Sequence, residues 1–168
     1  MKTNFNEKTL HEFENLTNGT KLAKFNRSKP LQLWLKFFSD CFGLNIDLKD
    51  ALIFKRFPGA SMILVPKEIT LTKCLETLKG TEIATNLKEE KVSLVRRKNT
   101  TYLLYHQKYH PLTLLEELIW LLFQFYKTGR LSFSQTHYTC SKYDDKEITI
   151  GVSKGKEKDY CIEMWYLN

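Results

Sequence analysis

The spacing of hydrophobic positions changes along this chain from three or four residues to two. Apolar side chains recur at helical spacing over 6–16, 31–38 and 115–126. After Gly129 they alternate with polar residues, which is typical of half-buried β-strands. Helical patterns first and a run of strand patterns last predict an α+β fold, with N-terminal helices and a C-terminal antiparallel β-meander.

The segment after residue 28 carries the signals of a helix start and stop. Ser28 offers a capping hydroxyl, Pro30 fits the first helical turn, and Gly43 fits a helix end. We therefore expect a helix of about 13 residues here. The segment 47–57 is expected to form a further helix, ended by Pro58.

The middle of the chain predicts a β-to-α step and a hairpin. The apolar run 61–65 is closed by proline and indicates a buried strand, and 70–79 predicts a helix that Gly80 ends. The runs 92–96 and 101–106 flank Lys-Asn, so we expect a central hairpin, although this is a weaker turn signal than Asn-Gly.

The clearest helix begins at Thr113. With Glu116 this threonine forms a capping-box pattern, and the apolar repeat runs on to Gly129. Three β-like runs between Leu131 and Leu167 follow, separated by short polar turns. We expect this amphipathic helix to pack on a three-stranded meander.

Length and composition favour one folded unit over 1–168. The chain is 42% hydrophobic and 13% aromatic, and it shows neither an internal repeat nor a Pro/Gly/Ser linker. A core of this size needs no disulfide or metal to fold.

The sequence predicts a cytoplasmic protein with free thiols. Its first residues are polar, and its longest apolar stretch, 118–123, is far shorter than the roughly 20 residues that cross a bilayer. We therefore expect no membrane association. The four cysteines are widely spaced: Cys41, Cys74, Cys140 and Cys161.

The stretch TLLEELIWLLFQFYKTGRLSF, followed by Thr139-Cys140-Ser141, resembles a family of uncharacterised bacterial proteins. In that family a helix beginning Thr-Leu-Leu-Glu ends in Thr-Gly, and a Thr-x-Cys-Gly-Ser-Arg segment precedes two closing strands. This chain lacks the glycine and arginine of that segment. The resemblance covers 62–168 loosely; it implies the α+β layout and a bacterial or phage-like origin, and it implies no mechanism.

Histidines and cysteines offer one candidate for metal or thiol chemistry. His106, His110, His137 and Cys140 could together supply zinc ligands, but Pro111 follows the first pair and the spacing matches no known zinc finger. We predict no zinc and no cofactor. A Cys140 or Cys161 nucleophile would need an imidazole within hydrogen-bond reach, which the sequence does not place.

A basic, tyrosine-rich segment is the remaining signal. The net charge is +7, and residues 51–108 hold six of these positive charges. Cations can neutralise phosphates while aromatic rings stack on unpaired bases; alternatively, the cations form a solvated turn and the tyrosines pack inside. The candidate nucleic-acid-binding residues are Arg96, Arg97, Lys98, Tyr102, Tyr105, Lys108 and Tyr109.

These patterns leave three functional hypotheses. The first is a non-catalytic accessory or protein-interaction protein of bacterial or mobile-element origin. The second is a nucleic-acid-binding module that uses residues 96–109. The third is a cysteine-, histidine- or metal-dependent enzyme, for which no motif provides direct support.

Overall fold

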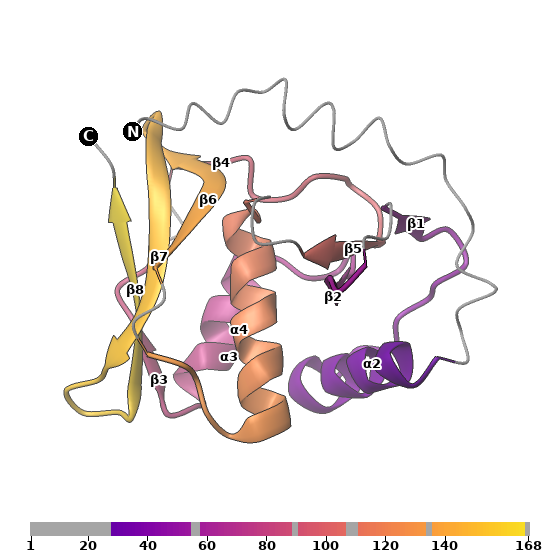
Figure 1. Ribbon diagram of the computed structural model, residues 1–168, viewed down its shortest axis with the longest axis horizontal. Coiled ribbons are helices and arrows are strands. Elements are labelled where there is room, and N and C mark those ends of the chain that lie inside the picture. Colours follow the sequence, from indigo (N-terminus) through magenta and orange to yellow (C-terminus); the bar gives the residue numbers. More distant parts are fainter. Residues whose placement is uncertain (1–27, 55–57, 89–90, 107–110, 134–135, 167–168) are drawn as a thin grey trace.

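A computed structural model describes the chain in five segments (Figure 1): residues 28–54, 58–88, 91–106, 111–133 and 136–166. The helix expected at 6–16 lies outside these residues. So do Lys108, Tyr109 and His110.

The described residues form three helices and two sheets, as expected for an α+β fold. The helices are α2 (Lys29–Phe42), α3 (Leu71–Lys79) and α4 (Leu114–Thr128). The three-stranded sheet has the order β1 (Leu52–Ile53), β5 (Tyr102–His106), β2 (Ser61–Val65). The five-stranded sheet has the order β3 (Ile83–Thr85), β8 (Tyr160–Tyr166), β7 (Lys146–Lys154), β6 (Thr136–Tyr143), β4 (Val92–Ser93).

Both sheets are mixed. β1 runs parallel to β5 and β3 runs parallel to β8, whereas all other neighbouring strands are antiparallel.

None of the helices in the described part of the chain has the length and apolar character needed to cross a membrane.

The expected helix caps are present. Ser28 accepts a hydrogen bond from the amide of Leu31, and Gly43 ends α2 in the left-handed conformation. Thr113 and Glu116 form the reciprocal capping box of α4. These local signals set the helix boundaries because each involves residues only three or four positions apart.

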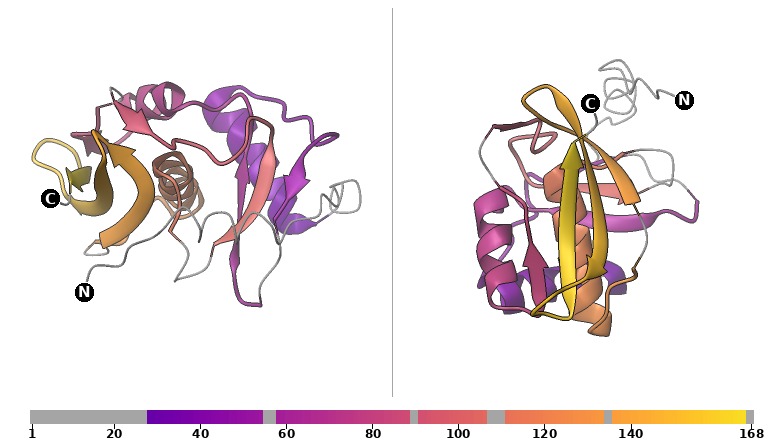
Figure 2. Two further views of the ribbon diagram at one scale, coloured as in Figure 1. Left: turned by 90° about the horizontal axis from the view of Figure 1, so that it is seen from above. Right: turned by 90° about the vertical axis from the view of Figure 1, so that its left-hand side faces the viewer.

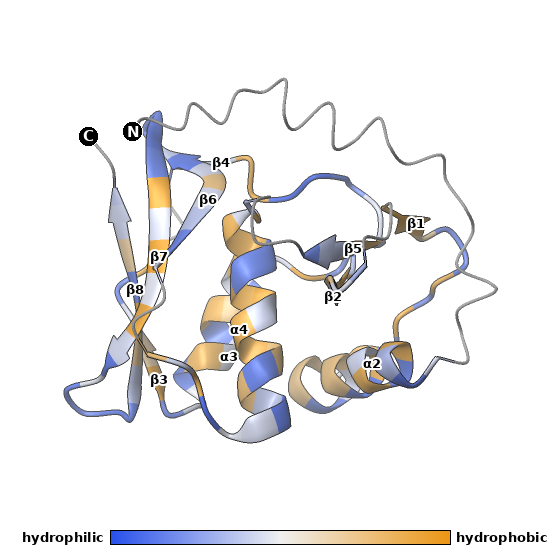
Figure 3. Cartoon of the chain, in the orientation of Figure 1, coloured by the Kyte–Doolittle hydropathy of each residue, from blue (hydrophilic) through white to orange (hydrophobic). Residues whose placement is uncertain are grey.

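Helix α4 lies between the two sheets. It contacts β2 of one sheet and β6 of the other. Figure 1 and the left view of Figure 2 show the five-stranded sheet on one side of α4 and α2 with the three-stranded sheet on the other. This position explains why α4 buries side chains on more than one face, and Figure 3 shows hydrophobic stretches along the helix with hydrophilic ones between them.

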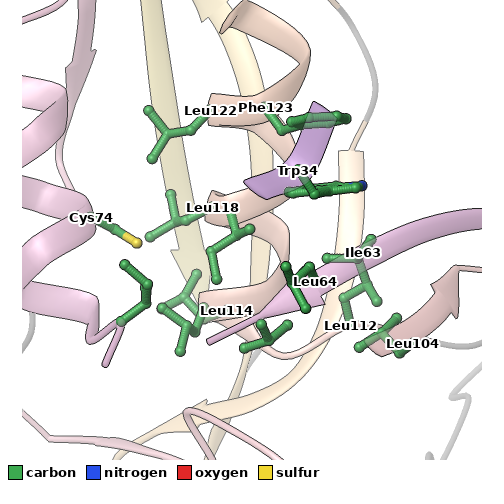
Figure 4. Packing of buried hydrophobic residues seen from close by; sticks show 14 of the residues in the cluster. Trp34, Ile63, Leu64, Cys74, Leu104, Leu112, Leu114, Leu118, Leu122 and Phe123 are labelled. Atoms are coloured by element: carbon green, nitrogen blue, oxygen red, sulfur yellow. The ribbon is translucent and has the colours of Figure 1, made fainter. Parts of the chain in front are cut away.

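The core joins all three helices to both sheets. Trp34 of α2 stacks on Phe123 of α4, with ring centroids 3.5 Å apart, while Cys74 of α3 is fully buried near Leu118 (Figure 4). The indole Nε1–H of Trp34 donates to the carbonyl of Met62, so its polar atom is satisfied as well.

The C-terminal meander forms as predicted, with one shift. β7 pairs antiparallel with β8 from Ile148–Tyr166 to Lys154–Tyr160. β6 turns into β7 through Asp144 and Asp145, which both have positive φ, as a two-residue hairpin turn requires. The first strand begins at Thr136 and not at Leu131, whose side chain is buried.

Two sequence predictions were wrong. The runs 92–96 and 101–106 do not pair: β4 ends at Ser93 because Leu94 takes a positive φ, and it pairs with β6, while β5 pairs with β1 and β2. In the described residues 47–54 there is no helix. Asp47 accepts from the amide of Lys49 in a turn, and the chain then continues as β1.

Candidate functional site

The basic segment points its arginines into the protein. The Arg97 side chain is 3% exposed and pairs with the fully buried carboxylate of Glu116, with Nε–Oε1 at 2.8 Å and Nη2–Oε2 at 3.1 Å. Its Nη2 also donates to the carbonyl of Pro111. Burial works against the charged guanidinium, but the charge and hydrogen bonds of Glu116 outweigh it and raise the pKa of Arg97.

Tyr102 completes this buried network. Its hydroxyl donates to Glu116 Oε1 at 2.7 Å and accepts the backbone N–H of Arg97 at 3.3 Å. Burial, followed by the adjacent negative charge of Glu116, holds the pKa of Tyr102 well above its usual value. The Glu116 carboxylate also accepts a hydrogen bond from the backbone amide of Thr113. It therefore binds Arg97, Tyr102 and the helix N-terminus at the same time.

The Arg96 side chain connects two loop segments, 66–69 and 98–100, through hydrogen bonds to their backbone. Its guanidinium donates to five backbone carbonyls, which belong to Pro66, Lys67, Ile69, Lys98 and Thr100. These carbonyls lie at the end of β2 and in the turn before β5. The geometry therefore gives Arg96 a role in shaping this corner of the fold.

The structure thus places most of the sequence-predicted nucleic-acid residues in structural contacts. Tyr102 and Tyr105 are 0% and 4% exposed, so neither ring is accessible for base stacking in this conformation. Lys98 is half-buried, and its carbonyl accepts from Arg96. Nucleic-acid binding by the 96–109 region stays a prediction, since Lys108 and Tyr109 lie outside the described residues.

The cysteines are not activated. Cys140 lies 4.0 Å from Arg97 Nη2, but burial outweighs this favourable charge and raises the pKa of the thiol to about 11. Burial raises the pKa of Cys74 to about 12. Both thiols are therefore protonated at neutral pH, the form that is a poor nucleophile and a poor metal ligand.

A second buried carboxylate, Glu117, faces the five-stranded sheet. Its side chain is 2% exposed, and its Oε1 lies 3.4 Å from Nδ1 of His137 on β6. Hydrogen bonding to Glu117 raises the pKa of His137, partial burial opposes the shift, and the carboxylate charge adds to it. The other oxygen, Glu117 Oε2, is buried and accepts no hydrogen bond from the described residues.

His106 at the end of β5 lies within electrostatic reach of this pair. Burial lowers the pKa of His106, Glu117 partly counters that effect, and His137 adds to the lowering. The ring of His106 meets Trp120 edge to face, at 6.2 Å between centroids. The Glu117 carboxylate therefore acts on two histidines, of which His137 has a raised pKa and His106 a lowered one.

Glu117 and His137 line a cavity of about 420 Å³ between α4 and the five-stranded sheet. This volume lies within the range of small-molecule sites, about 300–1,000 Å³. The walls combine apolar side chains with a few polar groups. They are Glu117, Trp120, Leu121, Gln124, Thr128, Arg130, Leu131, Ser132, His137, Ile150, Gly151 and Val152.

Sequence reasoning missed this pair, although one signal was present. Glu117 stands three residues from both Leu114 and Trp120, so a carboxylate interrupts an otherwise apolar helix face. A charged residue in such a position is seldom buried without a partner. The partner, His137, could not be found from the sequence because it lies on β6, 20 residues further along the chain, and meets Glu117 only where α4 packs against that strand.

Within the described part of the chain, no group of three or more His, Cys, Asp or Glu side chains is arranged to hold a metal ion. His110, a member of the zinc set considered above, lies outside that part.

Neither family models nor curated proteins nor solved structures provide a match to this chain. The resemblance noted from the sequence thus stays a prediction, and function has to be argued from the site itself.

Proposed function

We propose that this protein acts by binding rather than by catalysis, and that the cavity lined by Glu117 and His137 is its binding site. The pair of Glu117 and His137 carries this proposal. The Glu117 carboxylate holds the His137 imidazole in the cavity wall, with Oε1 and Nδ1 3.4 Å apart, and the His137 side chain is 28% exposed, so this imidazole is a polar group that a ligand in the cavity can contact.

The surroundings support recognition of a ligand with both apolar and polar parts. Trp120 and Leu121 of α4 face Ile150 and Val152 of β7 across the cavity. A largely apolar pocket with a few polar groups is the usual composition of a small-molecule site, in which the apolar walls provide affinity and the polar groups fix orientation.

The chemistry of the site favours binding over covalent catalysis. Glu117 contacts Nδ1 of His137, but among the described residues no cysteine lines the cavity, so this imidazole has no thiol beside it to activate. The buried thiols of Cys74 and Cys140 are protonated at neutral pH. An accessory role for the protein in a larger system is consistent with such a site.

A small-molecule library screened by thermal shift tests this proposal. We expect some compounds to raise the Tm of the wild type and of Glu163→Gln, a control on β8 that does not line the cavity. The same compounds should not stabilise Glu117→Gln, which loses the charge, or Leu121→Trp, which fills the cavity. Compounds that stabilise all four proteins equally would place the binding site elsewhere and contradict the proposal.

A further inference from the structure

A second cavity, of about 390 Å³, lies where the first half of α2, the start of β2 and the second half of α4 meet. Trp34 and Phe123, whose rings stack, lie at its base and are almost fully buried (Figure 4). The more accessible part of its wall includes Pro30, which is exposed, and Leu33 and Met62, which are half-buried. This wall therefore offers apolar surface to a further group.

Two lysines give the rim of this cavity a positive charge. Lys29, the first residue of α2, and Lys127, in the last turn of α4, both line it and are both exposed. Neither forms an ion pair with the described residues, and no acidic residue among them lines the cavity. Lys127 lies over the ring of Phe123, with Nζ 5.3 Å from the centroid, so its charge is held at the edge of the apolar surface. The cavity thus suits an occupant that combines apolar side chains with negative charge.

The segment 6–16, which precedes α2, has this combination in its sequence. Leu10, Phe13 and Leu16 recur at a spacing of three, which gives a helix one apolar stripe. Since successive helical residues are about 100° apart, Glu12 and Glu14 lie on opposite sides of this stripe, each about 100° from its middle. The segment holds three glutamates and one lysine, in a chain whose net charge is +7.

The connection between this segment and the cavity is long enough for the two to meet. Residues 17–27 separate the segment from Ser28, and they span up to about 36 Å when extended. Because Lys29 and Pro30 themselves line the cavity, the chain enters the described structure at its rim. A tether raises the effective concentration of the segment at the cavity, so even weak contacts can hold it there.

We propose that the segment 6–16 binds in this cavity as an amphipathic helix. Its apolar stripe covers the apolar wall, and the two glutamates beside the stripe pair with Lys29 and Lys127 at the rim. An apolar helix face laid into an apolar groove is a common mode of peptide recognition, and the flanking charges fix its orientation. This site is separate from the proposed ligand cavity, with which it shares one described wall residue, Trp120.

Hydrogen exchange of the full chain, measured by mass spectrometry of peptides that cover 6–16, tests this proposal. An isolated helix of this length is marginal in water, so we expect exchange to be slower by about tenfold or more in the protein than in a synthetic peptide of residues 1–20. Phe13→Asp should abolish the protection, because it places a charge in the apolar stripe. Lys29→Glu/Lys127→Glu should reduce it by about threefold or more. The control Lys146→Glu/Lys154→Glu, which changes two exposed lysines of β7, should not.

Reversing the charges on both sides identifies the contacts. Glu12→Lys/Glu14→Lys, combined with Lys29→Glu/Lys127→Glu, should restore the protection that the lysine changes remove. In the wild type, a carbodiimide, which joins a carboxylate to a neighbouring amine, should cross-link these glutamates to these lysines.

A mixture of unlabelled and isotope-labelled protein distinguishes the occupants. Cross-links found only within one isotopic form would assign the cavity to the chain's own segment, as proposed. Cross-links between the two forms would assign it to the segment of a second copy and would overturn the proposal. It is also overturned if the amides of 6–16 are unprotected, or if Lys29→Glu/Lys127→Glu leaves their protection unchanged.

Discussion

Arg97 and Glu116, 19 residues apart in the sequence, form a two-point ion pair that is almost completely removed from solvent. Glu116 also accepts from Tyr102 and from the amide of Thr113. The pair thus connects the segment before β5 to the first turn of α4. The two buried charges are tolerated because each is both paired and hydrogen-bonded, so the loss of one partner is expected to destabilise the fold.

Replacing Arg97 should therefore be far more damaging than replacing an exposed arginine. Arg97→Met leaves the Glu116 carboxylate buried without its cation, and we expect a loss of about 3–5 kcal/mol in the free energy of unfolding. Arg130→Met is the matched control and should change it by less than about 0.5 kcal/mol. Urea denaturation followed by circular dichroism measures both values.

If Arg97→Met does not fold, Arg97→Lys provides the second measurement. It keeps the charge but loses the two-point geometry, so it should be less stable than the wild type and more stable than the methionine variant. A methionine variant as stable as the Arg130 control would mean that the ion pair does not hold this corner together.

The helix cap at Thr113 should matter more than the one at Ser28. Both side chains accept a backbone N–H at a helix start, but Thr113 is fully buried and Ser28 is half-buried. Thr113→Ala should cost about 1–2 kcal/mol and Ser28→Ala about 0.5–1 kcal/mol, because water can replace the lost acceptor only at the exposed site. Thermal and urea unfolding of the two variants decides the order; equal losses would contradict it.

The pairing of His137 with Glu117 predicts a pH-dependent stability. The folded-state pKa of His137 is raised above its ordinary value of 6.5, so the stabilisation is fully present below that value and is lost as pH rises through the folded pKa. The stability difference between the wild type and His137→Asn should therefore shrink from pH 6 to pH 8.5. Urea midpoints measured across this range test it, and a constant difference would show that the pair is not charged.

His106 should behave in the opposite way. Its folded-state pKa is lowered, so the unfolded chain binds a proton more readily and His106 destabilises the protein as pH falls below about 6.5. His106→Asn should lose less stability than the wild type between pH 7 and pH 5.5. The same titration series measures both histidines.

Thiol labelling should separate the cysteines by burial. Cys74 and Cys140 are buried, with pKa values raised by burial to about 12 and about 11, whereas Cys41 and Cys161 are only partly buried. An aromatic disulfide reagent should react first with Cys41 and Cys161, and with the other two only after denaturant is added. Mass spectrometry of the labelled peptides identifies the sites. Rapid labelling of Cys140 in the native protein would revive the hypothesis of a thiol enzyme.

The parts of the fold that the sequence predicted are those with local causes. The helix ends were predicted from capping residues, each of which contacts backbone groups within one turn: Ser28, Gly43, Thr113 and Gly129. The alternation in 146–153 predicted a strand because its inner face packs on the core. In both cases neighbouring residues in the sequence carry all the information.

The parts that were missed depend on distant contacts. In the sequence, Arg96 and Arg97 look like solvent-exposed residues of a turn. In the structure, Arg96 donates to carbonyls of residues 66–69 and Arg97 pairs with the carboxylate of Glu116. The false hairpin has the same origin, since β5 finds its partners in β1 and β2. Similarly, no periodicity relates Glu117 to His137, which are brought together only when α4 packs against β6.

The position of β8 also has a consequence for how the chain can be made. β8 lies between β3 and β7 in the five-stranded sheet, and β3 precedes it by almost 80 residues. During synthesis, β3 and β7 therefore leave the ribosome before β8, and the strand edges that pair with β8 in the folded protein stay unpaired until β8 follows. Exposed strand edges of this kind promote association between chains. A nascent chain stalled before residue 160 is thus expected to recruit chaperones, and the released chain of 168 residues, in which β8 can pair, is expected not to need them.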